Sequence, residues 1–100
     1  MPKMSLTIPH RLTQDEALDR THSLLVDLKQ QHGDLITDLK ENWQGNRCTF
    51  SFKAKGLSTS GTLTVTQSQA ELTGSLPFAA LPFKGRIESE IRKRAEELLA

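Results

Sequence analysis

The stretch CTFSFKAKGLSTSGTLTVTQSQAELTGSL, residues 48–76, contains three successive runs in which apolar and polar residues alternate. Such alternation is typical of a β-strand that buries one face, because neighbouring side chains of a strand point to opposite faces. Gly56 interrupts the first run, and two more follow over residues 58–66 and 69–76. The residues that we expect to face the core are Cys48, Phe50, Phe52, Ala54, Leu63, Val65, Ala70, Leu72 and Leu76. The stretch therefore predicts three consecutive strands.

Two further strands are expected before this stretch. Gln44-Gly45-Asn46 marks a tight hairpin turn, so residues 35–43 are predicted to form the strand that enters it, although their pattern mixes apolar and charged residues. Residues 4–9 alternate clearly, and Pro9 is expected to end that strand or to place it at an edge of the sheet. Strands joined by short turns indicate an antiparallel sheet of about five strands.

Helical patterns lie on both sides of these strands. Thr13 and Glu16 form a capping box that predicts a helix start, and Gly33 is expected to end the same helix in a left-handed conformation. A second helix is predicted from about Pro82 or Phe83 to Leu99. Its charged residues suggest two ion pairs four residues apart, Glu88 with Arg92 and Glu90 with Arg94. The order β-α-β-β-β-β-α predicts one α+β domain over residues 1–100, a two-layer sandwich of a sheet and two helices.

The overall composition narrows the function only slightly. A net charge of +1 at pH 7, with acidic and basic residues interleaved, argues against broad electrostatic capture of nucleic acid. Cys48 is the single cysteine, so an intrachain disulfide cannot form. We find no signal-peptide pattern at the N-terminus and no apolar run long enough to span a bilayer, and we therefore expect a cytoplasmic protein without a transmembrane segment.

The residues that could carry catalysis do not form a recognisable motif. His10, His22 and His32 are spaced unlike metal ligands, and Cys48 is expected to be a buried, unreactive thiol between apolar neighbours. We find no nucleophile elbow, phosphate-binding loop or dinucleotide fingerprint. We therefore predict a protein that is not an enzyme, with no catalytic residues, no metal and no cofactor.

The segment LPFAALPF, residues 76–83, is the strongest candidate for a functional surface. One interpretation is that its apolar side chains close one end of the sandwich and fix where the last helix docks. The other is that Phe78, Leu81 and Phe83 form an apolar patch that touches a greasy surface or a partner. Lys84 and Arg86 follow in the first helical turn, where the helix dipole disfavours cations. Both interpretations can hold, because only one side of such a segment can face the core.

The sequence resembles the bacterial family called putative polyhydroxyalkanoic acid system proteins, over nearly the whole chain. The most specific matching segment is LPFKGRIESEI, residues 81–91. The others are PHRLTQDEA (9–17), HG (32–33), W-x-G-N (43–46), FSFKAKG (50–56) and GTLTVT (61–66). The resemblance implies a role around storage granules of polyhydroxyalkanoate, a hydrophobic polyester of the bacterial cytoplasm. It implies no catalytic residues.

Three hypotheses follow from these observations. The first is an accessory protein that associates with polyester granules or their coat proteins. In it, Phe78, Leu81 and Phe83 supply the apolar contact, and Lys84 and Arg86 meet anionic groups at the granule boundary. The second is a domain that binds an acyl chain or a hydroxyacid between the sheet and the last helix. Its pocket would be lined by Phe50, Phe52, Leu63 and Ile91. The third is a homodimeric adaptor that pairs through a sheet edge or the second helix.

Overall fold

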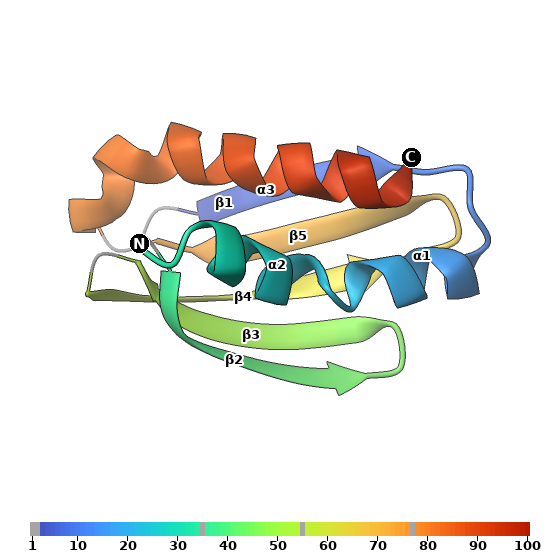
Figure 1. Ribbon diagram of the computed structural model, residues 1–100, viewed down its shortest axis with the longest axis horizontal. Helices are drawn as coiled ribbons and strands as arrows, with labels where there is room; N and C mark the ends of the chain where they lie inside the picture. Colours follow the sequence, from blue (N-terminus) through green and yellow to red (C-terminus); the bar gives the residue numbers. More distant parts are fainter. Residues whose placement is uncertain (1–2, 35, 55, 77) are drawn as a thin grey trace.

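The computed structural model describes residues 3–34, 36–54, 56–76 and 78–100, and it consists of one sheet covered by helices on one face (Figure 1). The strands are β1 (Lys3–Pro9), β2 (Ile36–Gln44), β3 (Arg47–Ala54), β4 (Leu57–Val65) and β5 (Gln69–Ser75). The helices are α1 (Gln14–Thr21), α2 (Leu24–Gln31), the 3-10 helix η1 (Phe78–Phe83) and α3 (Lys84–Leu99). The predicted α+β class is confirmed.

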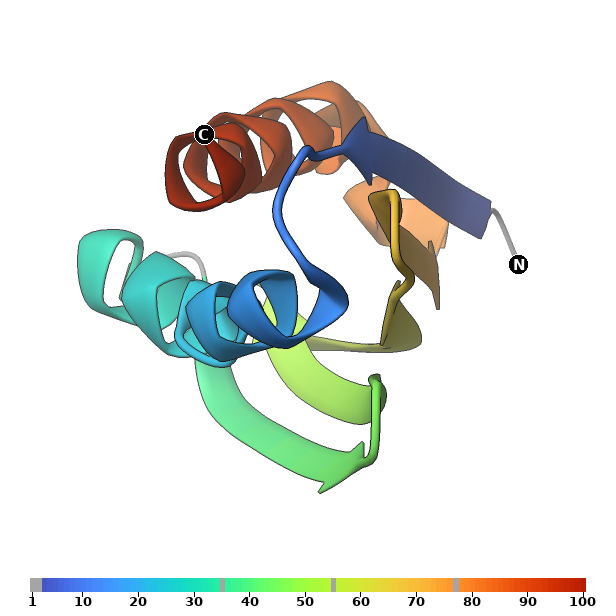
Figure 2. The same cartoon turned by 90° about the vertical axis from the view of Figure 1, so that its right-hand side faces the viewer.

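The five strands form one antiparallel sheet in the order β1-β5-β4-β3-β2. Strands β2 to β5 follow one another as hairpins, whereas β1 lies against β5, the last strand of the chain. The sheet curls around the helices, with α3 above β1 and β5 and with α1 and α2 above the other strands (Figure 2). The opposite face of the sheet has no helix over it among the described elements.

The core lies between the sheet and the helices, and it confirms the inward positions read from the alternating stretch. Every one of them whose burial is described is at most 4% exposed. Helix α3 adds Ile87, Ile91 and Ala95 to this core. Gly61 of β4 lies under the ring of Phe50, because a Cβ atom at this glycine would be 2.8 Å from Cζ of the ring. The glycine thus lets the aromatic side chain rest directly on the sheet.

The first helical segment differs from the expected single helix, since it breaks at His22 and Ser23. The hydroxyl of Thr21 donates to the backbone oxygens of Ala17 and Leu18, and that of Ser23 donates to the oxygen of Arg20. Such bonds compete with the helical ladder and bend or interrupt it. The N-cap at Thr13 is confirmed, because its hydroxyl oxygen accepts from the backbone N–H of Glu16, and the Glu16 carboxylate reaches back to the same hydroxyl group.

Two expectations about helix ends were wrong in detail. Gly33 does not adopt a left-handed conformation. The helix ends at the cap residue His32, whose backbone oxygen accepts from the N–H of Ile36. Helix α3 begins at Lys84, since Pro82 and Phe83 belong to the preceding 3-10 helix.

Strand β2 is irregular in its first half, which explains why residues 35–43 gave a mixed pattern. Its register against β3 shifts between Thr37 and Lys40, and Asp38 has a positive φ of 52°. A bulge of this kind inserts extra residues into one strand and disturbs the alternation of faces. The predicted hairpin at the other end is confirmed, with Gly45 at a φ of 60° between β2 and β3.

The candidate interaction surface

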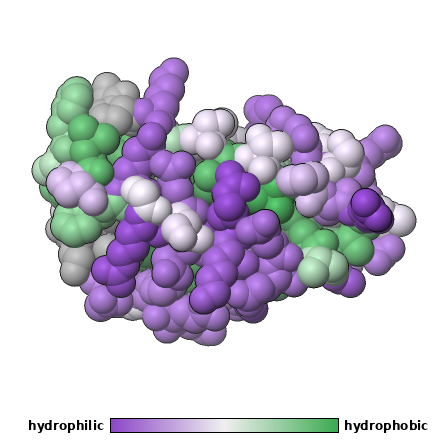
Figure 3. Space-filling view, turned by 90° about the horizontal axis from the view of Figure 1, so that it is seen from above, coloured by the Kyte–Doolittle hydropathy of each residue, from purple (hydrophilic) through white to green (hydrophobic). Residues whose placement is uncertain are grey.

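An apolar corner, which we define as Phe78 and Leu81, protrudes from η1. The side chain of Phe78 is 70% exposed and that of Leu81 is 42% exposed. A 3-10 helix has three residues per turn, so residues three apart lie one above the other on the same side. Hydrophobic surface gathers at the left-hand end of Figure 3, where Figure 1 places η1 and the start of α3. The two side chains therefore form one exposed apolar feature at an end of the molecule.

The flanking apolar residues fix this corner to the core. Leu76 is fully buried, and Phe83 is half-buried and packs against the core cluster. Within this segment, the buried and the exposed apolar positions thus belong to different side chains. Phe83 was predicted as one of the contact residues, but its side chain packs mainly against the core.

The two cations beside the corner differ in their surroundings. Nζ of Lys84 lies 3.5 Å from a carboxylate oxygen of Glu88, one turn further along α3. Arg86 is exposed, and no ion pair of its side chain is recorded within the described residues. The first turn of α3 has no acidic residue and no side-chain cap. Arg86 is therefore the better placed of the two to meet an external anion.

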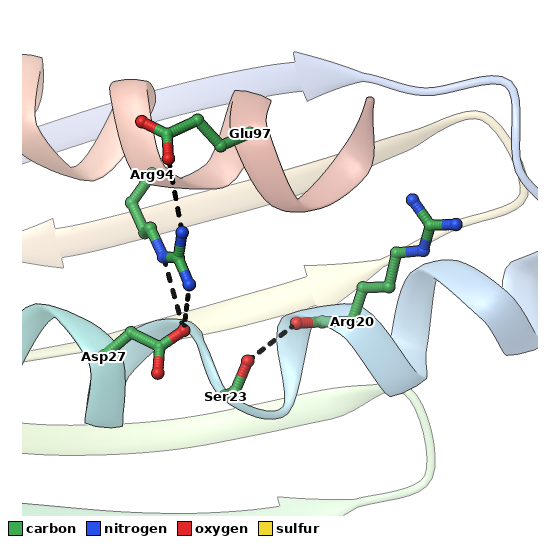
Figure 4. A network of polar contacts seen from close by, with 5 residues as sticks. All are labelled: Arg20, Ser23, Asp27, Arg94 and Glu97. Carbon is green, nitrogen blue, oxygen red and sulfur yellow. Dashed lines mark hydrogen bonds and ion pairs between the residues drawn. The ribbon is translucent and has the colours of Figure 1, made fainter.

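Polar contacts between α2 and α3 supplement the burial of the apolar face of α3. The guanidinium of Arg94 donates from Nε and Nη2 to Oδ2 of Asp27, at 3.3 and 2.7 Å, and from Nη1 to Glu97 (Figure 4). The hydrogen bond to Asp27 is the main reason why the pKa of Arg94 is raised. Nε2 of His32 lies 3.0 Å from Glu90. These contacts tie α2 to α3 at two levels.

The same contacts correct the ion pairs expected within α3. Glu88 is paired with Lys84 and Glu90 with His32, while Arg94 contacts Asp27 and Glu97. Arg92 reaches the backbone oxygen of Thr7 in β1. The predicted pairs of Glu88 with Arg92 and of Glu90 with Arg94 are thus wrong: Glu88 pairs one turn earlier in the same helix, while Glu90, Arg92 and Arg94 reach partners outside α3.

The four residues of the ligand-binding alternative are packed together in the core. Phe50, Phe52 and Ile91 are 4% exposed, Leu63 is 1% exposed, and the two phenylalanine rings are stacked with their centroids 6.1 Å apart. Ligand binding by these four residues stays a prediction.

A polar cluster that the sequence did not reveal lies where the edge strand β2 meets α1 and α2. The ring of His22 packs on Trp43, with centroids 4.3 Å apart. Oε1 of Glu41 is buried without a hydrogen-bond partner. Desolvation raises the pKa of Glu41, and Trp43 and His22 partly offset that effect. Burial also raises the pKa of the Cys48 thiol, as does the nearby charge of Glu41, so this cysteine is protonated and enclosed.

The other histidine contacts are structural. Nδ1 of His10 accepts from the backbone N–H of Leu12, and its Nε2 lies 3.0 Å from the oxygen of Thr66. Over the described residues, no three metal-binding side chains come together. None of the described helices has the length and apolar character needed to span a bilayer.

The comparison with known families uses almost the whole chain. Residues 4–99 match the model of the family described as "Putative polyhydroxyalkanoic acid system protein". The chain belongs to this family. No curated protein matches the sequence. Membership confirms the resemblance seen in the sequence, and it connects the protein with the polyhydroxyalkanoate storage system.

Proposed function

We propose that this protein is a non-enzymatic accessory of polyhydroxyalkanoate storage that associates in the cytoplasm with the granule surface or with a granule coat protein. The observation that carries the proposal is the exposure of the apolar corner, with Phe78 at 70% and Leu81 at 42%. Family membership supplies the polyester context.

The exposed apolar surface of this corner is unfavourable in water. Large apolar side chains that protrude next to each other lose hydration when an apolar phase or partner covers them, and contiguous exposed patches often mark interaction sites. Val26 on α2 is exposed to a similar degree, at 40%, but it belongs to a different element. It therefore serves as an internal control for what an exposed apolar residue contributes by itself.

The neighbouring residues take distinct roles in this proposal. Phe83 and Leu76 hold η1 on the core, so that Phe78 and Leu81 are presented on a rigid base. Arg86 provides a cation for anionic groups at the granule boundary. Lys84, which already neutralises Glu88, adds less.

The test is fractionation of the tagged protein from polymer-producing cells and from the same cells without polymer. We expect the protein in the granule fraction only when polymer is present. The double variant Phe78→Ser/Leu81→Ser should move to the soluble fraction, and Val26→Ser should fractionate like the wild type.

Two outcomes decide against the proposal. Wild-type protein that stays wholly in the soluble fraction with and without granules overturns it. Equal granule association of the double variant and the wild type overturns the role of the corner. Granules stripped of their coat proteins distinguish the two candidate partners, the polymer surface and a coat protein. Binding that is retained after stripping indicates that the protein contacts the polymer itself.

A further inference from the structure

The uncovered face of the sheet has a row of side chains that crosses all five strands. Paired positions run from Lys3 in β1 through Ser75, Ser60 and Ser51 to Lys40 in β2. Four strand spacings of about 4.8 Å place the backbones of the two lysines about 19 Å apart. The row therefore has one cation at each end and three hydroxyl groups between them.

Two hollows lie end to end along this row. One, of about 340 Å³, has Lys3, Ser60 and Ser75 in its lining, and the other, of about 360 Å³, has Lys40, Ser51 and Ser60. Both include Thr49, and the first also includes Thr62 and Thr73, which form the next row of side chains across the sheet. We call this feature the sheet trench: the five residues of the row with the wall of Thr49, Thr62 and Thr73.

The trench offers hydrogen-bond donors that the protein does not use itself. Its hydroxyl groups have no side-chain hydrogen bond recorded, and neither lysine has a recorded ion pair, within the described residues. Each hydroxyl can donate one bond, and each lysine can donate three. No acidic side chain belongs to the row or to the threonine wall. Glu41 also lines the second hollow, but it pairs with Phe50 and belongs to the core-facing side of β2.

We propose that the sheet trench binds a linear hydroxyacid oligoester, whose ester carbonyls accept from the hydroxyl groups and whose terminal carboxylate pairs with Lys3 or Lys40. An oligoester has hydrogen-bond acceptors along its length and a donor only at its hydroxyl end. It therefore complements a row of side chains that can all donate hydrogen bonds. The threonine methyl groups contact its alkyl parts. The choice of an ester oligomer, rather than another chain rich in acceptors, rests on the proposed function.

The distribution of charge favours this occupant over a polyanion. A polyphosphate or nucleic-acid backbone has a charge on every unit and needs cations along its path. In the trench the cations stand only at the ends, and the middle is neutral. The wall also lacks the aromatic side chains on which the bases of single-stranded nucleic acids stack.

The test is an NMR titration of the protein with soluble 3-hydroxybutyrate oligomers of increasing length. We expect backbone shifts at Ser51, Ser60 and Ser75, and affinity that rises with length until the oligomer spans the row. A methyl ester at the terminal carboxylate should weaken binding and remove most of its dependence on salt, because the pairing with lysine is lost.

Variants identify the groups responsible. Ser60→Val removes the central hydroxyl and should weaken binding about two- to tenfold, the worth of one hydrogen bond. Thr64→Val removes a hydroxyl from the same face one row beyond the wall, and it should bind like the wild type. Lys40→Gln should weaken the free acid more than the methyl ester. This variant also provides a readout should Ser60→Val not fold.

Each result bears on the inference. Shifts confined to residues 78–83, or no shift with any oligomer, overturn the trench. Tighter binding of linear polyphosphate than of the oligomers overturns the choice of occupant. A failure here leaves granule association intact, since that depends on the apolar corner. Conversely, Phe78→Ser/Leu81→Ser should keep full affinity for soluble oligomers even where granule association is lost.

Discussion

The double substitution Phe78→Ser/Leu81→Ser measures the free energy that the apolar corner contributes to binding a polyester surface. Complete burial of a Phe or Leu side chain is worth about 1.5–3 kcal/mol. Scaled by exposed fractions of 70% and 42%, the two residues together contribute about 2–3 kcal/mol when a surface covers both. Partitioning should therefore weaken by about 30- to 150-fold.

The assay is co-sedimentation of purified protein with amorphous polyhydroxyalkanoate particles, with the bound fraction followed over a range of particle concentrations. Because both residues are exposed, we expect the free energy of unfolding to change by less than about 0.5 kcal/mol, which urea denaturation checks. Val26→Ser is the matched control and should leave partitioning unchanged. A double variant that folds normally and partitions within about twofold of the wild type would refute the reasoning, because the exposed area would then lie outside the contact.

Gly61→Ala should lower the free energy of unfolding by about 2–3 kcal/mol, because the new Cβ overlaps Phe50 and the backbone of β5. Gly85→Ala has open space around the new Cβ and should raise the free energy of unfolding by about 0.5 kcal/mol. Equal urea midpoints for the two variants would contradict this. Glu41→Gln should stabilise the protein at neutral pH, because the raised pKa of Glu41 means that its ionised form costs the folded state free energy. This gain should vanish as the pH falls below about 4.5, where Glu41 is protonated in the folded and the unfolded protein alike. Thermal melts of both proteins across pH 3–8 test the sign of the difference in stability. Cys48 should react with iodoacetamide far more slowly in the native protein than in urea, and equal rates would mean that the thiol is accessible. Arg86→Gln should weaken binding to polyester particles coated with anionic lipid more than Lys84→Gln does, because Glu88 already neutralises Lys84. Arg86→Gln should also reduce the salt dependence of this binding more strongly. The opposite ranking of the two variants would contradict the role of Arg86 as the main cation.

The segment that forms the candidate site could be found in the sequence, but which of its side chains are exposed and which are buried could not. LPFAALPF stands out by composition, and the nearby cations are adjacent in the chain. Which of its side chains face water depends on how η1 and α3 pack, and that is set mainly by the burial of Leu76, Ile87 and Ile91 against segments far away in the sequence. The ion pairs predicted within α3 were wrong because Glu90 and Arg94 contact His32 and Asp27 instead, and because Glu88 pairs with Lys84 in α3 itself.

The clusters that the sequence missed are all assembled from distant segments. Glu41 and Trp43 lie on an irregular strand among polar neighbours. No pattern in the surrounding sequence indicates that this part of β2 packs next to His22. The sheet trench combines residues 3, 40, 51, 60 and 75, which come together only through strand register. The break at Ser23 could have been suspected, because Thr21 and Ser23 are both residues that bond to helical carbonyls.

Element types, strand faces and the α+β class can be read from the amino-acid order, because alternation with period two and helical spacing are local properties of the chain. The sequence also identified the family through segments spread over most of its length. The folded protein adds what these local patterns leave open: β1 pairs with β5, Phe78 and Leu81 face outward while Phe83 turns to the core, and Lys3 and Lys40 stand at the two ends of one row. These features depend on the register and docking of segments far apart in the chain, and the free energy that selects them comes from burying the whole core at once.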